Sequence, residues 1–304
     1  MVIRITQQMK VNMMMQSTNG AMNGLFNVQK QILTGKKFTA PYENPYGASQ
    51  VVKIKAQLGQ LYDWQRNIDD AKDELKNTYD ILTEMQENVQ RINELAIRLA
   101  NEANSPETCE ALVMEIRERA KTISTIADSE WQGNYIFGGT NTLNPPYMID
   151  NDLNVTYNGT VPGQIWERKV EISKYEEVAL NVFGHDILGD ANGGYLATVK
   201  KLVDVGSTMP IDALNVNALL DDLKAGTSAI LCAQAQISST VNRLDTQRNI
   251  NEILLTNLIA VRSSIEDTDI IEASSQLALK QASLEASLKI SATLLGGPSL
   301  LNYL

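Results

Sequence analysis

One uninterrupted heptad pattern, from Ile54 to Ala103, constrains the fold of this chain more than any other feature. Apolar and small residues recur there in steps of three and four, which is the 3.5-residue repeat of a coiled-coil seam. After Gly59 neither glycine nor proline interrupts the run. A helix of roughly 50 residues extends about 75 Å, which is too long for an ordinary globular domain. The pattern therefore predicts a rod-like helical bundle, and the seam residues expected in its core are Leu61, Ile68, Leu75, Leu82, Val89, Ile92 and Leu99.

Two further heptad runs extend this bundle. A break at residues 104–107 offers Ser105 as an N-cap and Pro106 as the first helical residue. The run that follows, Cys109 to Ile126, should fold back as an antiparallel helical hairpin. Both cysteines, Cys109 and Cys232, fall on seam positions and are expected to be small core residues.

The third run, Leu223 to Ile265, has several polar seam positions. Such residues either set the register and choice of partner or leave wet patches in a bundle, and the pattern alone does not separate these alternatives. Its expected core residues are Ile237, Val241, Leu244 and Leu258.

Both ends of the chain carry shorter stripes, Met14 to Ile32 and Ile270 to Leu295. They are rich in Gln, Ser, Thr and Asn, and each would be a marginal helix alone in water. We expect the two ends to pair with each other or with neighbouring chains, through an assembly seam of Leu25, Val28, Ile32, Leu277, Leu284 and Leu288. The first acidic residue is Glu43, and only basic residues precede it: Arg4, Lys10, Lys30, Lys36 and Lys37.

The middle of the chain, residues 135–194, is rich in Gly, Asn, Pro and strand-forming residues, which predicts a β-rich insert. Residues 153–157 and 165–172, separated by Asn158-Gly159 and Pro162-Gly163, are predicted to pair as a β-hairpin.

Composition excludes several classes of function. The net charge of −10 argues against nucleic-acid binding, and no stretch of 18 apolar residues could span a membrane. The single histidine, His185, has only the adjacent Asp186 as an orienting acid, so we predict no catalytic site and no enzyme. The loop Asp186–Gly194 lacks the EF-hand spacing and its closing Glu, and we predict no metal and no cofactor. The N-terminus has no apolar signal-peptide region, so the residues alone suggest a cytoplasmic protein.

The ends and long helices together resemble the flagellar hook-associated protein 3 family, a flagellin-like family of hook–filament junction proteins. The resemblance rests on the opening IRITQQM (3–9), on the segments 28–49 and 131–142, on Asn67 in the first long helix, on NRLD (242–245) and on the C-terminal segments 265–274, 278–291 and 299–304. The insert, from about residue 145 to 195, is not covered closely. Flagellin itself is the alternative within the superfamily, and three features favour the junction protein: the Arg-Ile-Thr-Gln opening, the Tyr-Ile-Phe-Gly-Gly-Thr segment and the closing Asn-Tyr-Leu. The segment 235–240 and Gly296-Gly297-Pro298 depart from the family pattern.

The resemblance implies a mainly α, flagellin-like fold, a long antiparallel helical bundle formed by both chain ends with a small β-rich inserted domain. Residues 1–45 and 266–304 would form a terminal polymerisation domain that is disordered in the monomer. Residues 46–144 and 195–265 would form the bundle, and 145–194 the outer domain.

The implied function is a structural one: a subunit that joins hook to filament by axial polymerisation. The implied partners are copies of itself, the other hook-associated junction protein, flagellin, and an export chaperone at the C-terminal helix, with no nucleic acid and no membrane. Export through the flagellar type III channel without a cleaved signal peptide would place the protein outside the cell. A flagellin filament subunit and a cytoplasmic coiled-coil adaptor remain as competing hypotheses, with an enzyme built on His185 as a third class.

Overall fold

The computed structural model describes residues 7–101, 103–160, 168–208 and 213–295. Its contacts divide the chain into two compact units. The terminal unit comprises Met1–Gln60 and Ile253–Leu304, and the central unit comprises Leu61–Glu252. The domain boundaries predicted from the sequence stay a prediction.

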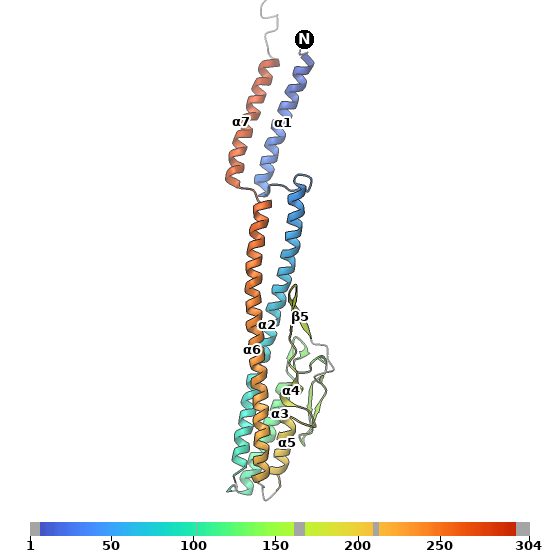
Figure 1. The fold of residues 1–304 in the computed structure, drawn as a ribbon, viewed down its shortest axis with the longest axis vertical. Coiled ribbons are helices and arrows are strands. Elements are labelled where there is room, and N and C mark those ends of the chain that lie inside the picture. Colours follow the sequence, from blue (N-terminus) through green and yellow to red (C-terminus); the bar gives the residue numbers. More distant parts are fainter. Residues whose placement is uncertain (1–6, 102, 161–167, 209–212, 296–304) are drawn as a thin grey trace, which may run out of the picture. The chain divides into compact units, whose positions relative to one another are not determined.

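Long helices from both ends of the chain account for most of the fold (Figure 1). The expectation of a mainly helical architecture with a small strand-containing insert is confirmed. The helices are α1 (Gln7–Thr34), α2 (Pro45–Leu99), α3 (Pro106–Ala127), α4 (Gly184–Leu188), α5 (Tyr195–Gly206), α6 (Ala213–Glu266) and α7 (Ile270–Leu295). The strands are β1 (Glu130–Trp131), β2 (Asn134–Tyr135), β3 (Tyr147–Ile149), β4 (Val155–Tyr157), β5 (Lys169–Ser173) and β6 (Glu176–Ala179).

Within the central unit, α2 and α6 run antiparallel. The Asn93 side-chain amide donates to Thr227 Oγ1 at 2.8 Å, and Gln234 Nε2 donates to Thr83 Oγ1 at 3.1 Å. Nearer the other end of the pair, ion pairs join Lys72 to Asp245 and Arg248 to Asp69. Polar seam positions of α6 thus carry direct hydrogen bonds to α2, which hold the register of the two helices.

The buried Asn251 extends this polar seam to the insert. Its amide donates to the Ile172 carbonyl at 3.2 Å, and its Oδ1 accepts a hydrogen bond from Gln247. An unpaired amide at this depth would cost free energy, so these bonds are what make a polar residue tolerable there.

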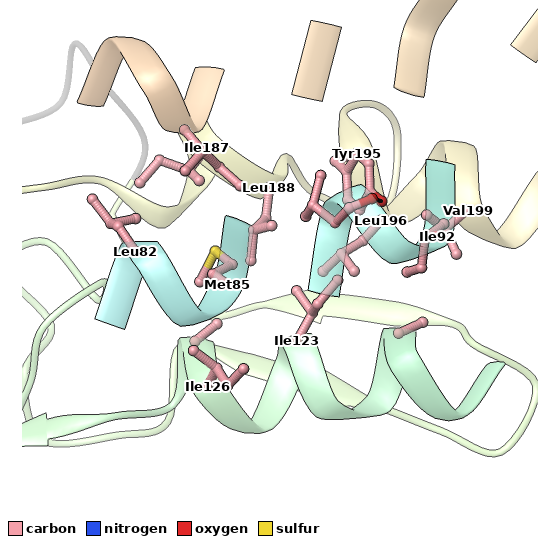
Figure 2. Close-up of a cluster of buried hydrophobic side chains, with 14 of the residues drawn as sticks. Leu82, Met85, Ile92, Ile123, Ile126, Ile187, Leu188, Tyr195, Leu196 and Val199 are labelled. Carbon is pink, nitrogen blue, oxygen red and sulfur yellow. Dashed lines mark hydrogen bonds between the residues drawn. The ribbon is translucent and has the colours of Figure 1, made fainter. Parts of the chain in front are cut away.

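The core of the central unit joins α2, α3, α4 and α5. Figure 2 shows Leu82 and Met85 of α2 between side chains of α3 and those of α4. Tyr195, at the start of α5, is buried and donates its hydroxyl to the Val89 carbonyl at 3.3 Å. A Cβ on Gly226 would come within 2.2 Å of the Tyr195 ring, so α6 can approach α5 here only because residue 226 is glycine.

The start of α3 follows the predicted capping pattern. Ser105 has an extended backbone and its side chain accepts a hydrogen bond from the Thr108 amide, while Pro106 opens the helix. Two side-chain bonds, from Arg91 to Glu115 and from Arg119 to Asn88, then tie α3 antiparallel to α2. The N-cap and the helical hairpin are therefore confirmed.

The predicted β-hairpin is wrong in its pairing. β4 pairs with the preceding strand β3, and β5 pairs with the following strand β6. The physical reason lies in the turn after β3, where Asp150 Oδ1 accepts the amides of Asp152 and Asn154 and so reverses the chain at once. Residues 161–167, which include Pro162-Gly163, lie outside the described residues.

The expectation that both cysteines are core residues is also wrong for one of them. Cys109 is buried, whereas Cys232 is exposed. On α6 the core side of the helix is occupied instead by Ile230 and Gln234. A separate finding concerns the hydropathy of the helices: among the described residues, none of them has the length and apolarity needed to cross a lipid bilayer.

Candidate assembly surface

The two units differ sharply in how they use their apolar residues. Most buried hydrophobic residues in the described chain belong to the central unit, whereas most exposed large hydrophobic residues belong to the terminal unit. Those exposed in the terminal unit are Met9, Met13, Met15, Met22, Phe26, Leu33, Tyr42, Tyr46, Val52, Ile253, Leu254, Ile259, Val261, Ile270, Ile271, Leu279, Leu288 and Ile290. Single exposed apolar side chains are ordinary, whereas contiguous apolar surface marks an interaction site, so the arrangement of these residues along each helix decides what they do.

Helices α1 and α7 lie side by side within the terminal unit (Figure 1). Val28 is buried and Leu25 half-buried on the α7 side of α1. On α7, Ala273 is buried and Leu277 and Leu284 are half-buried. Each helix thus uses one apolar stripe to pack against the other inside a single chain.

The residues predicted as an assembly seam divide between this intrachain contact and the solvent. Val28 is buried, and Leu25, Ile32, Leu277 and Leu284 are half-buried. Leu288 is 51% exposed. The contribution of these side chains to assembly stays a prediction.

Helix α1 carries a second apolar stripe that its pairing with α7 does not use. Met15, Met22, Phe26 and Leu33 follow each other in steps of seven, four and seven residues, which is heptad spacing. They lie about a quarter of a turn from the stripe that faces α7. Their exposed fractions are 56%, 60%, 65% and 86%, so the described chain leaves more than half of each residue's surface open. We refer to these four residues as the outer stripe of α1.

Helix α7 also has an outer stripe. Ile271, Leu279 and Ile290 are 82%, 71% and 57% exposed. They lie on roughly the opposite side of α7 from the α1 contact, with Ser275, Ala282 and Ala286 between them at the same spacing. The stripe therefore presents bulky apolar side chains separated by small ones, which is a surface into which side chains of another helix can interdigitate.

The sequence reasoning missed both outer stripes. The sequence interpretation identified one apolar seam along each helix. The second seam runs along neighbouring positions of the same helix and has the same heptad spacing. A search for every apolar series at heptad spacing, not only the strongest, would have found them.

The residues predicted for the core of the bundle are placed as follows. Val241 and Leu258 are half-buried. The structure buries Leu61, Ile68, Leu75, Leu82, Val89, Ile92, Leu99, Ile237 and Leu244.

Other candidate sites carry little chemistry. His185 lies in α4 with Nδ1 3.4 Å from Asp186 Oδ1. In the Gly-rich loop that follows, Asp190 Oδ1 accepts the amides of Asn192 and Gly193, so this carboxylate closes a turn. Across the described part of the chain, no group of three or more His, Cys, Asp or Glu side chains is arranged to hold a metal ion.

Comparison with known proteins relates this architecture to flagellar proteins. Residues 5–142 match the family model described as the bacterial flagellin N-terminal helical region. The flagellin of Salmonella typhimurium is 25% identical over 142 residues, which cover 44% of this chain and 29% of the flagellin. The flagellin of Salmonella rubislaw matches with the same figures. The match to this chain thus spans less than a third of the length of these flagellins.

Solved structures decide the fold. Flagellar hook-associated protein 3 from Legionella pneumophila superposes with a TM-score of 0.63 at 14% identity, covering 71% of this chain and 98% of the other. The chain has the fold of the flagellar junction proteins. FlgL from Bacillus cereus has a TM-score of 0.58 at 23% identity, covering 69% of this chain and 99% of the other. A protein from Vibrio parahaemolyticus assigned to the flagellar hook-associated proteins has a TM-score of 0.68 at 17% identity and is covered completely.

Proposed function

We propose that this chain is a structural subunit of the bacterial flagellum that connects the hook to the filament by polymerising along the flagellar axis. The observation that carries the proposal is the apolar surface of the terminal unit, which the described residues of the chain leave exposed. A chain with the junction-protein fold and such a surface needs neighbours to bury it. Its role is packing and not chemistry.

The magnitudes favour an array of many contacts over a single pairing. Full burial of one large apolar side chain contributes about 1.5–3 kcal/mol, so the exposed parts of the four residues in the outer stripe of α1 contribute about 4–8 kcal/mol together. Association of two chains costs about 4–15 kcal/mol in lost freedom. One stripe is therefore marginal, whereas two stripes engaged in every copy favour a continuous assembly.

Copies of the same chain are the first partners in this proposal. The outer stripe of α1 in one copy packs against an apolar stripe of a neighbouring copy, with α7 supplying the second contact. The predicted polymerisation domain, residues 1–45 and 266–304, belongs to the same proposal.

The finer assignments follow the resemblance to junction proteins. At its two boundaries the array meets the other hook-associated junction protein and flagellin. Before export, a chaperone covers α7, whose outer stripe would otherwise promote aggregation in the cell. The protein then leaves through the flagellar type III channel without a cleaved signal peptide and functions outside the cell.

A flagellin filament subunit is the second candidate, and the match of residues 5–142 to the flagellin family model favours it. Gold-labelled antibody on intact isolated flagella, viewed by electron microscopy, separates the two. A single band at the hook–filament boundary supports the junction role. Label along the whole filament would establish the flagellin role instead. Protein found only inside the cell, with unlabelled flagella, would refute both and favour the cytoplasmic coiled-coil adaptor.

A further inference from the structure

Two connections in the terminal unit are bonded to each other although they are far apart in the sequence. One is the segment 35–44 between α1 and α2, and the other is the segment 267–269 between α6 and α7. The Lys37 amide donates to the Glu266 carbonyl at 2.7 Å, and the Thr268 amide donates to the Gly35 carbonyl at 2.8 Å. These two backbone bonds bracket an isolated antiparallel bridge and close the connections on each other.

The carboxylate of Glu266, the last residue of α6, lies at the centre of this arrangement. Glu266 is only 6% exposed. Its Oε1 accepts hydrogen bonds from Lys36 Nζ at 2.6 Å and from Lys55 Nζ at 3.1 Å. A buried carboxylate is costly unless it is paired, and here one oxygen receives two ammonium groups from different parts of the chain. These hydrogen bonds from Lys36 and Lys55 hold the pKa of Glu266 below its usual range.

The longer connection, residues 35–44, makes further hydrogen bonds and an ion pair with the helices beside it. Lys37 Nζ donates to the Ser264 carbonyl at 2.6 Å, which ties the connection to the last turn of α6. Lys30 on α1 pairs with Glu43 at 2.6 Å, and Glu43 Oε2 accepts the Thr39 amide at 2.8 Å. The connection is thus held on one side to α1 and on the other side to α6.

The closed arrangement also has a cost. The Thr268 hydroxyl is buried without a hydrogen-bond partner in the described part of the chain. An unsatisfied buried hydroxyl disfavours the closed state, so the closed state needs a compensating interaction. The ion pairs of Glu266 are the charged interactions placed to supply it, because Lys36 reaches them from one connection and Lys55 from α2.

We propose that Glu266 is an ionic lock. When its carboxylate is charged and holds Lys36 and Lys55, the two connections stay closed and α1 and α7 are anchored together beside the ends of α2 and α6. When the charge is lost, the connections separate and both terminal helices gain freedom to reorient. The lock concerns the terminal unit alone and is independent of what the protein assembles with.

Hydrogen–deuterium exchange on the full-length chain tests the lock. In Glu266→Gln the side chain keeps its shape and loses its charge, so we expect exchange at the Lys37 and Thr268 amides to accelerate about tenfold or more. The matched control is Glu285→Gln, which removes the same charge from an exposed position on α7. Exchange at Ile92 in the central unit should not change in either variant. Unchanged exchange at Lys37 and Thr268 in Glu266→Gln, or an equal acceleration in Glu285→Gln, overturns the proposal.

A second variant covers the case in which Glu266→Gln loosens the whole terminal unit, which exchange at Val28 would reveal. Lys36→Gln removes one of the two ammonium groups and leaves Lys55 in place, so it should give a smaller acceleration at the same two amides. If Lys36→Gln leaves both amides as slow as in the wild type, Lys36 does not hold the lock and the proposal fails.

The consequence for assembly rests on the proposed function. If the lock anchors the terminal helices for polymerisation, Glu266→Gln should raise the protein concentration needed for assembly, whereas Glu285→Gln should not. A wild-type chain that does not assemble at all contradicts the proposed function, while the exchange experiment still decides on the lock. Normal assembly by Glu266→Gln, together with fast exchange at Lys37 and Thr268, would show that the lock exists but does not serve polymerisation.

Discussion

Replacement of Phe26 by alanine tests the assembly surface at the centre of the outer stripe of α1. Phe26 is 65% exposed, so its side chain contributes little to the folding of its own chain but has most of its area left to bury. Full burial of such a side chain is worth about 1.5–3 kcal/mol, and two-thirds of that is about 1–2 kcal/mol per copy. Since 1.4 kcal/mol corresponds to a factor of ten, the concentration needed for assembly should rise about five- to thirtyfold.

The measurement is the fraction of protein that sediments as a function of total concentration. Tyr175→Ala is the matched control, because Tyr175 is an aromatic residue that is 89% exposed in the turn between β5 and β6. It should leave the assembly concentration unchanged. Thermal unfolding of both variants should stay within about 0.5 kcal/mol of the wild type, because neither side chain is buried in the chain.

Two outcomes would refute the reasoning. One is an assembly concentration for Phe26→Ala that equals that of the wild type. The other is an equal rise for Phe26→Ala and Tyr175→Ala, since the loss would then reflect general surface hydrophobicity and not the outer stripe of α1.

Three further predictions follow from other parts of the structure. Leu288→Asp should prevent assembly, because it places a charge on a half-exposed apolar position of α7. Circular dichroism should still report a folded helical core, and undiminished sedimentation of this variant would count against the prediction. Gly226→Ala should lower the free energy of unfolding by about 1–3 kcal/mol in denaturant titration, because its Cβ would meet the Tyr195 ring at 2.2 Å; an unchanged midpoint would contradict the close packing of α5 on α6. The stability that Glu266 adds should be present above pH 4.5, the usual pKa of a Glu side chain, and should be lost as the pH falls through its lowered pKa in the folded state. The difference in melting temperature between wild type and Glu266→Gln should therefore shrink in acid, and a constant difference would refute the assignment.

The long helices could be predicted from the sequence because their signal is local and repeated. The heptad series that includes Leu61 and Leu99 lies in a single helix of 55 residues, and the series through Leu244 lies in one of 54. The N-cap at Ser105 could be predicted in the same way, because it depends only on the residues next to it.

The pairing of the strands could not be predicted from the sequence in the same way. Asn158-Gly159 is a strong turn signal that would pair β4 with the strand that follows it. Instead β4, which contains Tyr157, pairs with the preceding strand β3. The turn closed by Asp150 reverses the chain earlier and brings β4 back alongside β3. Two competing turn signals a few residues apart cannot be ranked without the contacts that each of them permits.

Cys232 shows the same limit within a helix. It was placed on a seam, but the helix turns it to solvent, whereas Gln234, two positions further on, is buried and donates to Thr83. A heptad series specifies which residues share one face of a helix. Two residues that are two positions apart lie on nearly opposite faces, so an error of two positions in assigning the seam exchanges the buried and the exposed face.

The sequence by itself therefore determined the helical character of this chain, the presence of its long helices and the presence of an insert between them, because spacing, caps and breaks act over a few residues. Only the tertiary structure decided which face of each helix is already occupied. α1 and α7 each carry two apolar stripes, and one stripe of each is used within the chain. Which stripe remains for a neighbour depends on contacts between residues more than two hundred positions apart, such as Lys36 with Glu266, and no local pattern contains that information.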